Sequence, residues 1–242
     1  MNVVRGFSLS NARLLADLCA QAYTTATIET DLCHIVSTPA EFAEDGQPYS
    51  ILAFRGSKSP LDFLTDAKIK FARLPGGQQL HEGFHASVSS IWDQLLKLDQ
   101  RAPPAPVILT GHSKGGGEAL IAAFLLNRAG RHVHSVYTFG APRVGDRNFK
   151  RDYNLALGFN TWSWIHEEDI VPRLPPCILK GYRRAGTICF LPAFGHGFLW
   201  NPWIGYMLLS DVWGAWKEYR QGRDAFLADH PIARYQTALA NL

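Results

Sequence analysis

Charge is sparse in this 242-residue sequence, and the little that is present almost cancels. Charged residues make up 19% of the chain, and the formal net charge is only +3 at pH 7. So small an excess gives no reason to expect a nucleic-acid partner or attraction of the whole protein to an anionic membrane. Hydrophobic residues, at 47%, and aromatic residues, at 12%, are plentiful instead. This balance argues against a disordered chain and indicates a globular protein with a large core.

Cysteine is rare as well. The four cysteines, Cys19, Cys33, Cys177 and Cys189, form no C-x-x-C pair, which argues against zinc ribbons and dithiol redox sites. Free buried thiols are the simplest expectation, and a disulfide between Cys19 and Cys33 or between Cys177 and Cys189 is the alternative. The sequence holds no metal-ligand cluster and no cofactor motif, so we expect no metal and no cofactor.

Long apolar runs are missing too. No stretch of about 18 uninterrupted apolar residues occurs, so the sequence predicts no transmembrane helix. The first seven residues, MNVVRGF, lack the basic and apolar regions of a signal peptide. We therefore expect a cytoplasmic protein, although a secreted protein whose signal had been removed would show the same features. No repeat or linker divides the chain, and we predict a single domain over residues 1–242.

The stretch that carries most information is GHSKG at residues 111–115. An apolar, β-branched run at 107–110 precedes it and predicts a buried strand, and the apolar run 118–126 that follows predicts a helix. A glycine-flanked serine at a strand-to-helix turn is typical of a nucleophile elbow, in which a strained backbone pushes the hydroxyl clear of the turn. We therefore predict that Ser113 is a catalytic nucleophile.

Strand and helix patterns alternate along the rest of the chain, and Ser8 or Ser10 is suited to cap the first helix. The predicted strands are 27–38, 49–54, 132–140, 161–166 and, at the sheet edge, a strand or hairpin over 182–191; the predicted helices are 12–23, 81–98 and 232–239. This alternation predicts an α/β fold, with a mostly parallel central sheet and helices on both faces.

Two further side chains would have to activate Ser113. A histidine must take the proton of the hydroxyl, and a carboxylate must fix the tautomer of that histidine. In the α/β-hydrolase fold the chain order is serine, acid, histidine. Asp169 follows the predicted strand 161–166 directly and is the best candidate for the acid. His196 and His230 both satisfy the order, and order alone does not choose between them.

Five motifs in the chain together resemble those of the class 3 lipases, the fungal-type triacylglycerol lipases and their bacterial relatives. They are FRGS at 54–57, HEGF at 81–84, GHSKGG at 111–116, TFGAPRVGD at 138–146 and DIVPRLPP at 169–176. The resemblance covers about residues 50–176 and returns at His230. It implies an α/β-hydrolase fold with a Ser113–Asp169–His230 triad. It favours His230 over His196 because a tyrosine, here Tyr235, follows the histidine of the family in the last helix.

The resemblance also implies an oxyanion hole. Backbone N–H groups of Lys114 and Ser57 would donate to the charged oxygen of a tetrahedral intermediate. Lys114 departs from the leucine often found at this place in fungal members, so its charge must face solvent or a polar group. His112 and His81 are interpreted as core histidines with satisfied hydrogen bonds.

Two segments outside the five motifs have assignments of their own. Within residues 58–80, the apolar side chains of Leu61, Phe63 and Leu64 share one face of a short helix, which predicts a lid-like flap. A fixed helix packed on the core is the alternative. The aromatic-rich stretch 194–226 predicts a helical insertion and not a strand.

These features predict a serine carboxylic-ester hydrolase that cleaves acylglycerols or similar apolar esters through an acyl-enzyme. Its expected partners are the ester substrate and, transiently, a lipid surface. A feruloyl-type esterase or a phospholipase A1 would use the same fold and mechanism. A non-catalytic binding protein is the alternative of a different class, and the complete set of triad residues argues against it.

Overall fold

A nine-stranded sheet forms the centre of the molecule, in the order β1-β3-β4-β7-β8-β9-β10-β11 with β2 paired on β3. The computed structural model describes residues 2–42, 46–57, 70–98, 105–167, 169–175, 181–192, 197–203, 205–207, 209 and 230–242. The strands of the sheet are β1 (Asn2–Val3), β2 (Ile28–Glu29), β3 (His34–Phe42), β4 (Pro48–Phe54), β7 (Val107–His112), β8 (Val133–Phe139), β9 (Thr161–His166), β10 (Thr187–Leu191) and β11 (Leu199–Trp200). A separate antiparallel pair joins β5 (Phe71–Arg73) to β6 (Gln79–His81).

The middle of the sheet is parallel, as the sequence predicts. Strands β4, β7, β8, β9 and β10 pair in parallel, whereas β3 and β11 pair antiparallel to β4 and β10. Every residue of β7 and β9 is buried, because helices cover both faces of a parallel sheet. The carboxyl ends of these strands therefore meet along one edge.

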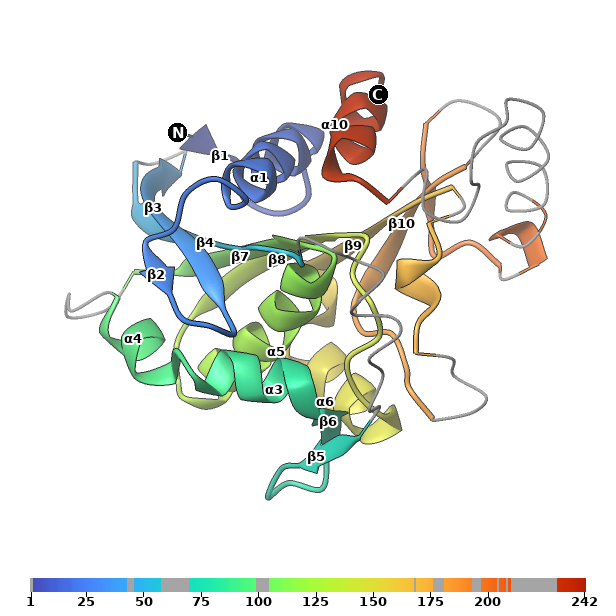
Figure 1. Cartoon of the computed structure of the whole chain (residues 1–242). Helices are drawn as coiled ribbons and strands as arrows, with labels where there is room; N and C mark the ends of the chain where they lie inside the picture. The colour runs from blue at the N-terminus through green and yellow to red at the C-terminus, as the bar shows by residue number, and fades with distance from the viewer. Residues whose placement is uncertain are drawn as a thin grey trace.

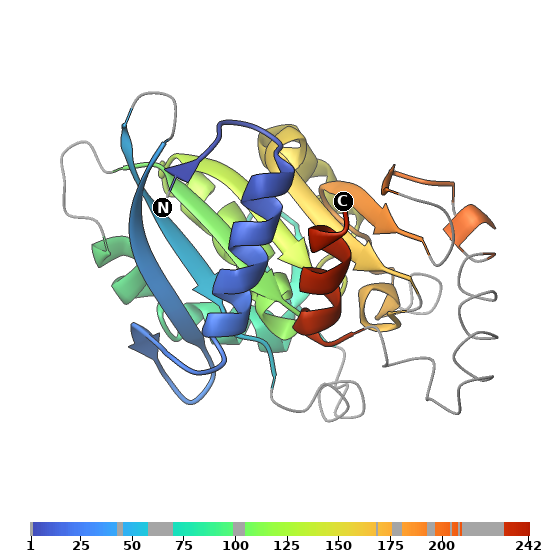
Figure 2. The same ribbon diagram turned by 90° about the horizontal axis from the view of Figure 1, so that it is seen from above.

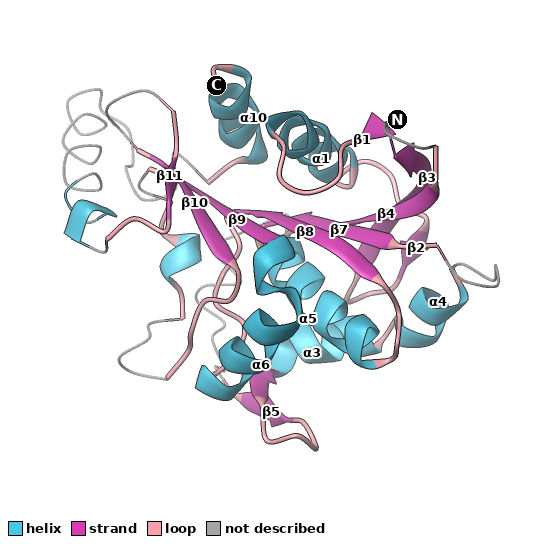
Figure 3. Ribbon diagram, turned by 180° about the vertical axis from the view of Figure 1, so that it is seen from behind, coloured by secondary structure: helices cyan, strands magenta, loops and turns pink. Residues whose placement is uncertain are grey.

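Helices cover the sheet on both sides (Figures 1 and 2). On one face α1 (Leu9–Gln21) packs beside α10 (Ile232–Ala240), and on the other lie α3 (Glu82–Ser89), α5 (Lys114–Arg128) and α6 (Arg147–Leu157). Figure 3 shows the same layers from behind, with α4 (Trp92–Lys97) near the β3 edge. The architecture is the α/β-hydrolase arrangement that the sequence predicts.

Short polar signals set the helix ends. Ser8 caps α1, because its Oγ accepts hydrogen bonds from the backbone N–H groups of Ser10 and Asn11. Asp146 caps α6 by accepting from the N–H of Phe149 at 2.8 Å. Such caps satisfy N–H groups that have no partner inside the helix. Of the two predicted caps for the first helix, Ser8 is the one the structure uses.

Two predicted elements are each divided in the structure. The predicted strand 27–38 is a hairpin, because the chain turns between β2 and β3, where Thr30 Oγ1 accepts a 3.0 Å bond from the N–H of Cys33. The predicted helix 81–98 is two helices, α3 and α4, because the backbone leaves helical geometry at Ile91, with φ of −120°. The apolar spacing marks which face is buried but does not reveal these breaks.

The aromatic-rich stretch 194–226 contains a short strand that the sequence analysis did not predict. Leu199–Trp200 forms β11 and pairs antiparallel with β10, with Phe190 opposite Leu199. The prediction that this stretch contains no strand is wrong, because two residues suffice to add a strand at the edge of the sheet. Most of the stretch lies outside the described residues.

The thiols are free in the part of the chain that the structure describes. Cys19, Cys33 and Cys189 are buried and unbridged, so both alternative disulfides are wrong; Cys177 itself lies outside the described residues. Among the same residues, no helix is long and apolar enough to cross a membrane.

Candidate active site

Ser113 occupies the sharp turn between β7 and α5. Its backbone is left-handed, with φ of 58° and ψ of −129°, a conformation that is costly for a residue with a side chain. The surrounding fold holds it there, because the Ser113 N–H donates to the carbonyl oxygen of Phe139 at 2.9 Å. A side chain on Gly111 would collide with the backbone of Gly115, and one on Gly115 with the carbonyl oxygen of Phe54. The two glycines are therefore required for the elbow.

His230 joins Ser113 to Asp169. Its Nε2 lies 2.8 Å from Ser113 Oγ, and its Nδ1 lies 2.9 Å from each carboxylate oxygen of Asp169. An ionised carboxylate only accepts hydrogen bonds, so Nδ1 carries the proton and Nε2 is left to accept from the serine hydroxyl. All three side chains are buried. The structure thus brings the three predicted residues together in the order that proton transfer requires.

Asp169 is held by donors besides His230. Its Oδ1 accepts from the backbone N–H of Val171 at 3.0 Å, and its Oδ2 accepts from the hydroxyl of Tyr235 at 2.6 Å. That hydroxyl in turn accepts from the N–H of His166, the last residue of β9, at 3.1 Å. Tyr235 therefore ties the carboxylate to the end of the strand that carries it.

We predict that Tyr235→Phe lowers kcat by about ten- to a hundredfold and leaves KM unchanged, because a hydrogen bond to a buried charged group contributes roughly 1.5–3 kcal/mol. Steady-state kinetics on a soluble ester checks this. Tyr153→Phe is a matched control, since its buried hydroxyl bonds Thr161 Oγ1 at 2.9 Å elsewhere in the fold. Equal losses of kcat in the two variants would remove Tyr235 from the site.

His112, directly before the nucleophile, supports the backbone of His230. Its Nε2 lies 2.7 Å from the His230 carbonyl oxygen, and its Nδ1 lies 2.7 Å from the hydroxyl of Tyr23. A carbonyl only accepts, so Nε2 donates and Nδ1 accepts from the tyrosine. Burial, and then the neighbouring His230, lower the pKa of His112 to about 3, and the ring stays neutral. The prediction of a core histidine with satisfied hydrogen bonds is confirmed.

This neutral histidine makes the fold sensitive to acid. Because the folded pKa of about 3 lies below the ordinary 6.5, the unfolded chain binds a proton that the folded chain excludes. The stabilisation is complete above pH 6.5 and declines as the pH falls, by about 1.4 kcal/mol per pH unit. We predict that His112→Gln makes the pH dependence of the free energy of unfolding shallower by about that amount. Urea unfolding between pH 6.5 and 4 measures both slopes, and identical slopes would contradict the assignment.

The two predicted oxyanion donors belong to segments that border the nucleophile. Lys114 is the first residue of α5, where backbone N–H groups have no partner inside the helix. Ser57 follows the end of β4, which is paired with β7 through Phe54 and Gly111. The residue before Ser57, Gly56, lies so close that an added Cβ would be 3.2 Å from the Cβ of Ser113. Lys114 is therefore at the elbow, and Ser57 follows a residue that contacts it.

The charged side chain of Lys114 forms an ion pair within α5. Its Nζ lies 2.6 Å from Oε1 of Glu118, one turn further along α5, and donates to the carbonyl oxygen of Leu32 at 2.7 Å. Glu118 is fully buried and also accepts from the hydroxyl of Ser87. Burial raises the pKa of Glu118, and Lys114 acts in the opposite direction. Lys114, which stands where fungal members often have leucine, therefore has a buried carboxylate as its partner.

Several predicted residues lie outside the described part of the chain. They are Leu61, Phe63 and Leu64 of the predicted lid, and His196, the alternative base. His230 is therefore selected by its own contacts. Tyr23 was missed by sequence reasoning, because it contacts His112 across 89 positions of the chain and no local pattern marks it.

The parallel sheet, the helices on both faces and the contacts of Ser113, His230 and Asp169 define an α/β-hydrolase-fold protein with a triad-type site. Within that class, the family model described as lipase (class 3) matches residues 51–179. The match takes in more than half of the chain. The chain belongs to the class 3 lipase family.

Curated relatives of the chain are fungal lipases. The lipase of Rhizomucor miehei is 34% identical over 152 residues, which cover 59% of this chain and 41% of that protein. Secreted mono- and diacylglycerol lipase A of Penicillium cyclopium is 31% identical over 162 residues, which cover 63% of this chain and 52% of that protein. The chain therefore spans about half or less of the length of these relatives.

Solved structures agree on the fold. Rhizomucor miehei triacylglyceride lipase superimposes with a TM-score of 0.61 over 75% of this chain and 79% of that chain, at 24% identity. A mutant MDLA from Penicillium cyclopium gives a TM-score of 0.66 over 79% and 85% of the two chains, at 19% identity.

Proposed function

We propose that this protein hydrolyses carboxylic esters through an acyl-enzyme formed on Ser113. The observation that carries the proposal is the buried, continuous chain of hydrogen bonds from Ser113 through His230 to Asp169. A serine hydroxyl in water is a poor nucleophile, and this arrangement supplies the base that activates it. The strained elbow then presents the oxygen to substrate.

The reaction divides into two halves. As Ser113 Oγ attacks the ester carbonyl, His230 Nε2 takes its proton, and Asp169 stabilises the imidazolium that forms. Backbone N–H groups of Lys114 and Ser57 donate to the developing oxyanion, each worth roughly 3 kcal/mol. His230 then gives the proton to the leaving alcohol. In the second half, water attacks the acyl group by the same route and frees the serine.

The proposed substrates are acylglycerols or similar apolar esters. Support comes from membership of the class 3 lipase family and from relatives named as lipases and as mono- and diacylglycerol lipases. Contact with a lipid surface would use Leu61, Phe63 and Leu64 as a lid. These assignments extend the family relationship to the whole protein.

A panel of esters tests the proposal. We expect hydrolysis of soluble esters, with kcat/KM rising as the acyl chain lengthens, and lower rates on a feruloyl ester and on a phospholipid. The Ser113→Ala variant measures the background. A preference for the feruloyl ester or the phospholipid would keep the mechanism and change the substrate, whereas no hydrolysis above background would contradict the proposal.

A further inference from the structure

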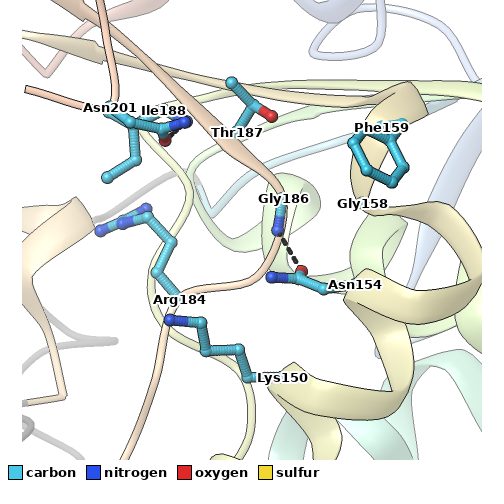
Figure 4. Close-up of a pocket in the computed structure, with 9 residues that line it drawn as sticks. All are labelled: Lys150, Asn154, Gly158, Phe159, Arg184, Gly186, Thr187, Ile188 and Asn201. Carbon is cyan, nitrogen blue, oxygen red and sulfur yellow. Dashed lines mark hydrogen bonds between the residues drawn. The ribbon is translucent and has the colours of Figure 1, made fainter.

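A second site lies away from the nucleophile. A pocket of about 360 Å³ opens between α6 and the start of β10, and Figure 4 shows its lining side chains. Along β10, Thr187 pairs with Trp162 and Leu191 pairs with His166. The pocket is therefore at the end of the strand opposite to Asp169, which follows His166. It is not part of the candidate active site.

Two side-chain amides in the lining of this pocket present hydrogen-bond donors. Two asparagines in its lining each use their side-chain oxygen to accept from backbone N–H groups: Asn154 from Gly186 and Asn201 from Ile188, both at 2.8 Å. Of the oxygen and the nitrogen of a side-chain amide, only the oxygen can accept from an N–H, and this fixes the orientation of both amides. Each NH₂ group is left as a donor, and none of the described residues that line the pocket is a carboxylate. The lining thus favours an anion.

Two cations complete the lining. Lys150 of α6 and Arg184, before β10, both border the pocket, and neither forms an ion pair with a described residue. The Arg184 guanidinium donates to the carbonyl oxygen of Ala141 at 3.3 Å. Burial, followed by repulsion from the neighbouring Arg143, lowers the pKa of Arg184 to about 9, so it remains charged at neutral pH. Asp169 offsets part of this repulsion, and a bound anion would offset more of it.

The surface around the pocket carries further cations and exposed apolar side chains. Arg147 and Arg183 line an adjoining hollow that shares Lys150 and Asn154 with the pocket, together with Arg151, which is paired with Asp152 at 2.7 Å. At the pocket rim, Phe159 is 92% exposed, and Leu155, one turn away, is 80% exposed. Exposed apolar side chains beside a cluster of cations are typical of surfaces that rest on anionic lipid.

We propose that this pocket binds the phosphate group of an anionic phospholipid at a lipid surface, with Phe159 entering the apolar layer beside it. Lys150, Arg184 and the two amide groups would surround the phosphate oxygens. The site would dock the protein on a lipid surface without touching the ester being cleaved. It does not depend on the proposed esterase activity, because ester hydrolysis and docking are measured separately.

The test uses the full chain and vesicles of ether-linked lipids, which offer no ester to cleave. We expect co-sedimentation with vesicles that contain phosphatidic acid and none with phosphatidylcholine alone. Lys150→Glu should weaken this binding about tenfold or more, since reversal removes a cation and adds an anion. Asn154→Asp should weaken it as well, because the acid keeps an oxygen for Gly186 and replaces the donor with a negative charge.

Lys97→Glu is the matched control: it makes the same charge change on exposed α4 and should leave vesicle binding unchanged. All three variants should hydrolyse a soluble short-chain ester at the rate of the unchanged protein. Equal binding to vesicles without phosphatidic acid, or an equal loss in Lys97→Glu, would overturn the proposal. Protection of the fold by inorganic phosphate without any vesicle binding would also overturn it, in favour of a site for soluble phosphate.

Discussion

Replacing Ser113 with alanine is expected to reduce turnover of a soluble ester about a million-fold, the scale of loss when a triad nucleophile is removed. The side chain supplies the atom that forms the acyl bond and contributes little packing. The backbone bond from the Ser113 N–H to Phe139 is unaffected by the change. Alanine also has the same Cβ in the same left-handed conformation, so the melting temperature should not change.

The measurement is kcat/KM of the purified variant, with thermal unfolding as the check on the fold. Ser163→Ala is a matched control, because Ser163 is a buried serine of β9 whose hydroxyl accepts from Thr138 at 3.2 Å. It should retain activity. More than a few per cent of activity in Ser113→Ala would show that the elbow serine is not the nucleophile.

The second large effect concerns the base. His230→Ala should be as damaging as Ser113→Ala, because without the imidazole the hydroxyl keeps its proton. The double variant should lose little more, since residues that act as a unit are strongly non-additive. Burial of His230 between Ser113 and Asp169, with contacts of 2.8–2.9 Å, is the structural basis.

The control for this prediction is His196→Ala, which removes the other histidine that satisfies the chain order. It should have a mild effect on kcat. The reverse ranking would assign the base to His196 and contradict the geometry at His230.

How far the sequence could anticipate this site depends on how local each signal is. The elbow was predictable because GHSKG and its two apolar flanks are contiguous, and the strain at Ser113 follows from the turn they form. The parallel sheet was predictable for the same reason, since each strand carries its own apolar run. Its place directly after a predicted strand selected Asp169. Chain order left His196 and His230 open, and the resemblance to the class 3 lipases favoured His230. The contact that decides between them spans 117 positions of the chain.

The remaining features depend on distant residues. Tyr23, His112 and His230 come together from three separate segments. No sequence pattern near Tyr23 predicts its hydrogen bond to His112. The amino-acid composition likewise does not predict the donor-lined pocket beside α6. A net charge of +3 gives no sign of it, because the charges that matter are gathered by the fold.

The most direct test of the central claim is labelling with a fluorophosphonate, which reacts only with an activated serine. We predict stoichiometric modification of the unchanged protein, with the added mass on the peptide that contains Ser113. Labelling should be absent from Ser113→Ala and from His230→Ala, while Ser163→Ala should label fully. A folded protein that remains unlabelled, or a label on another serine, would contradict the claim that Ser113 is an activated nucleophile.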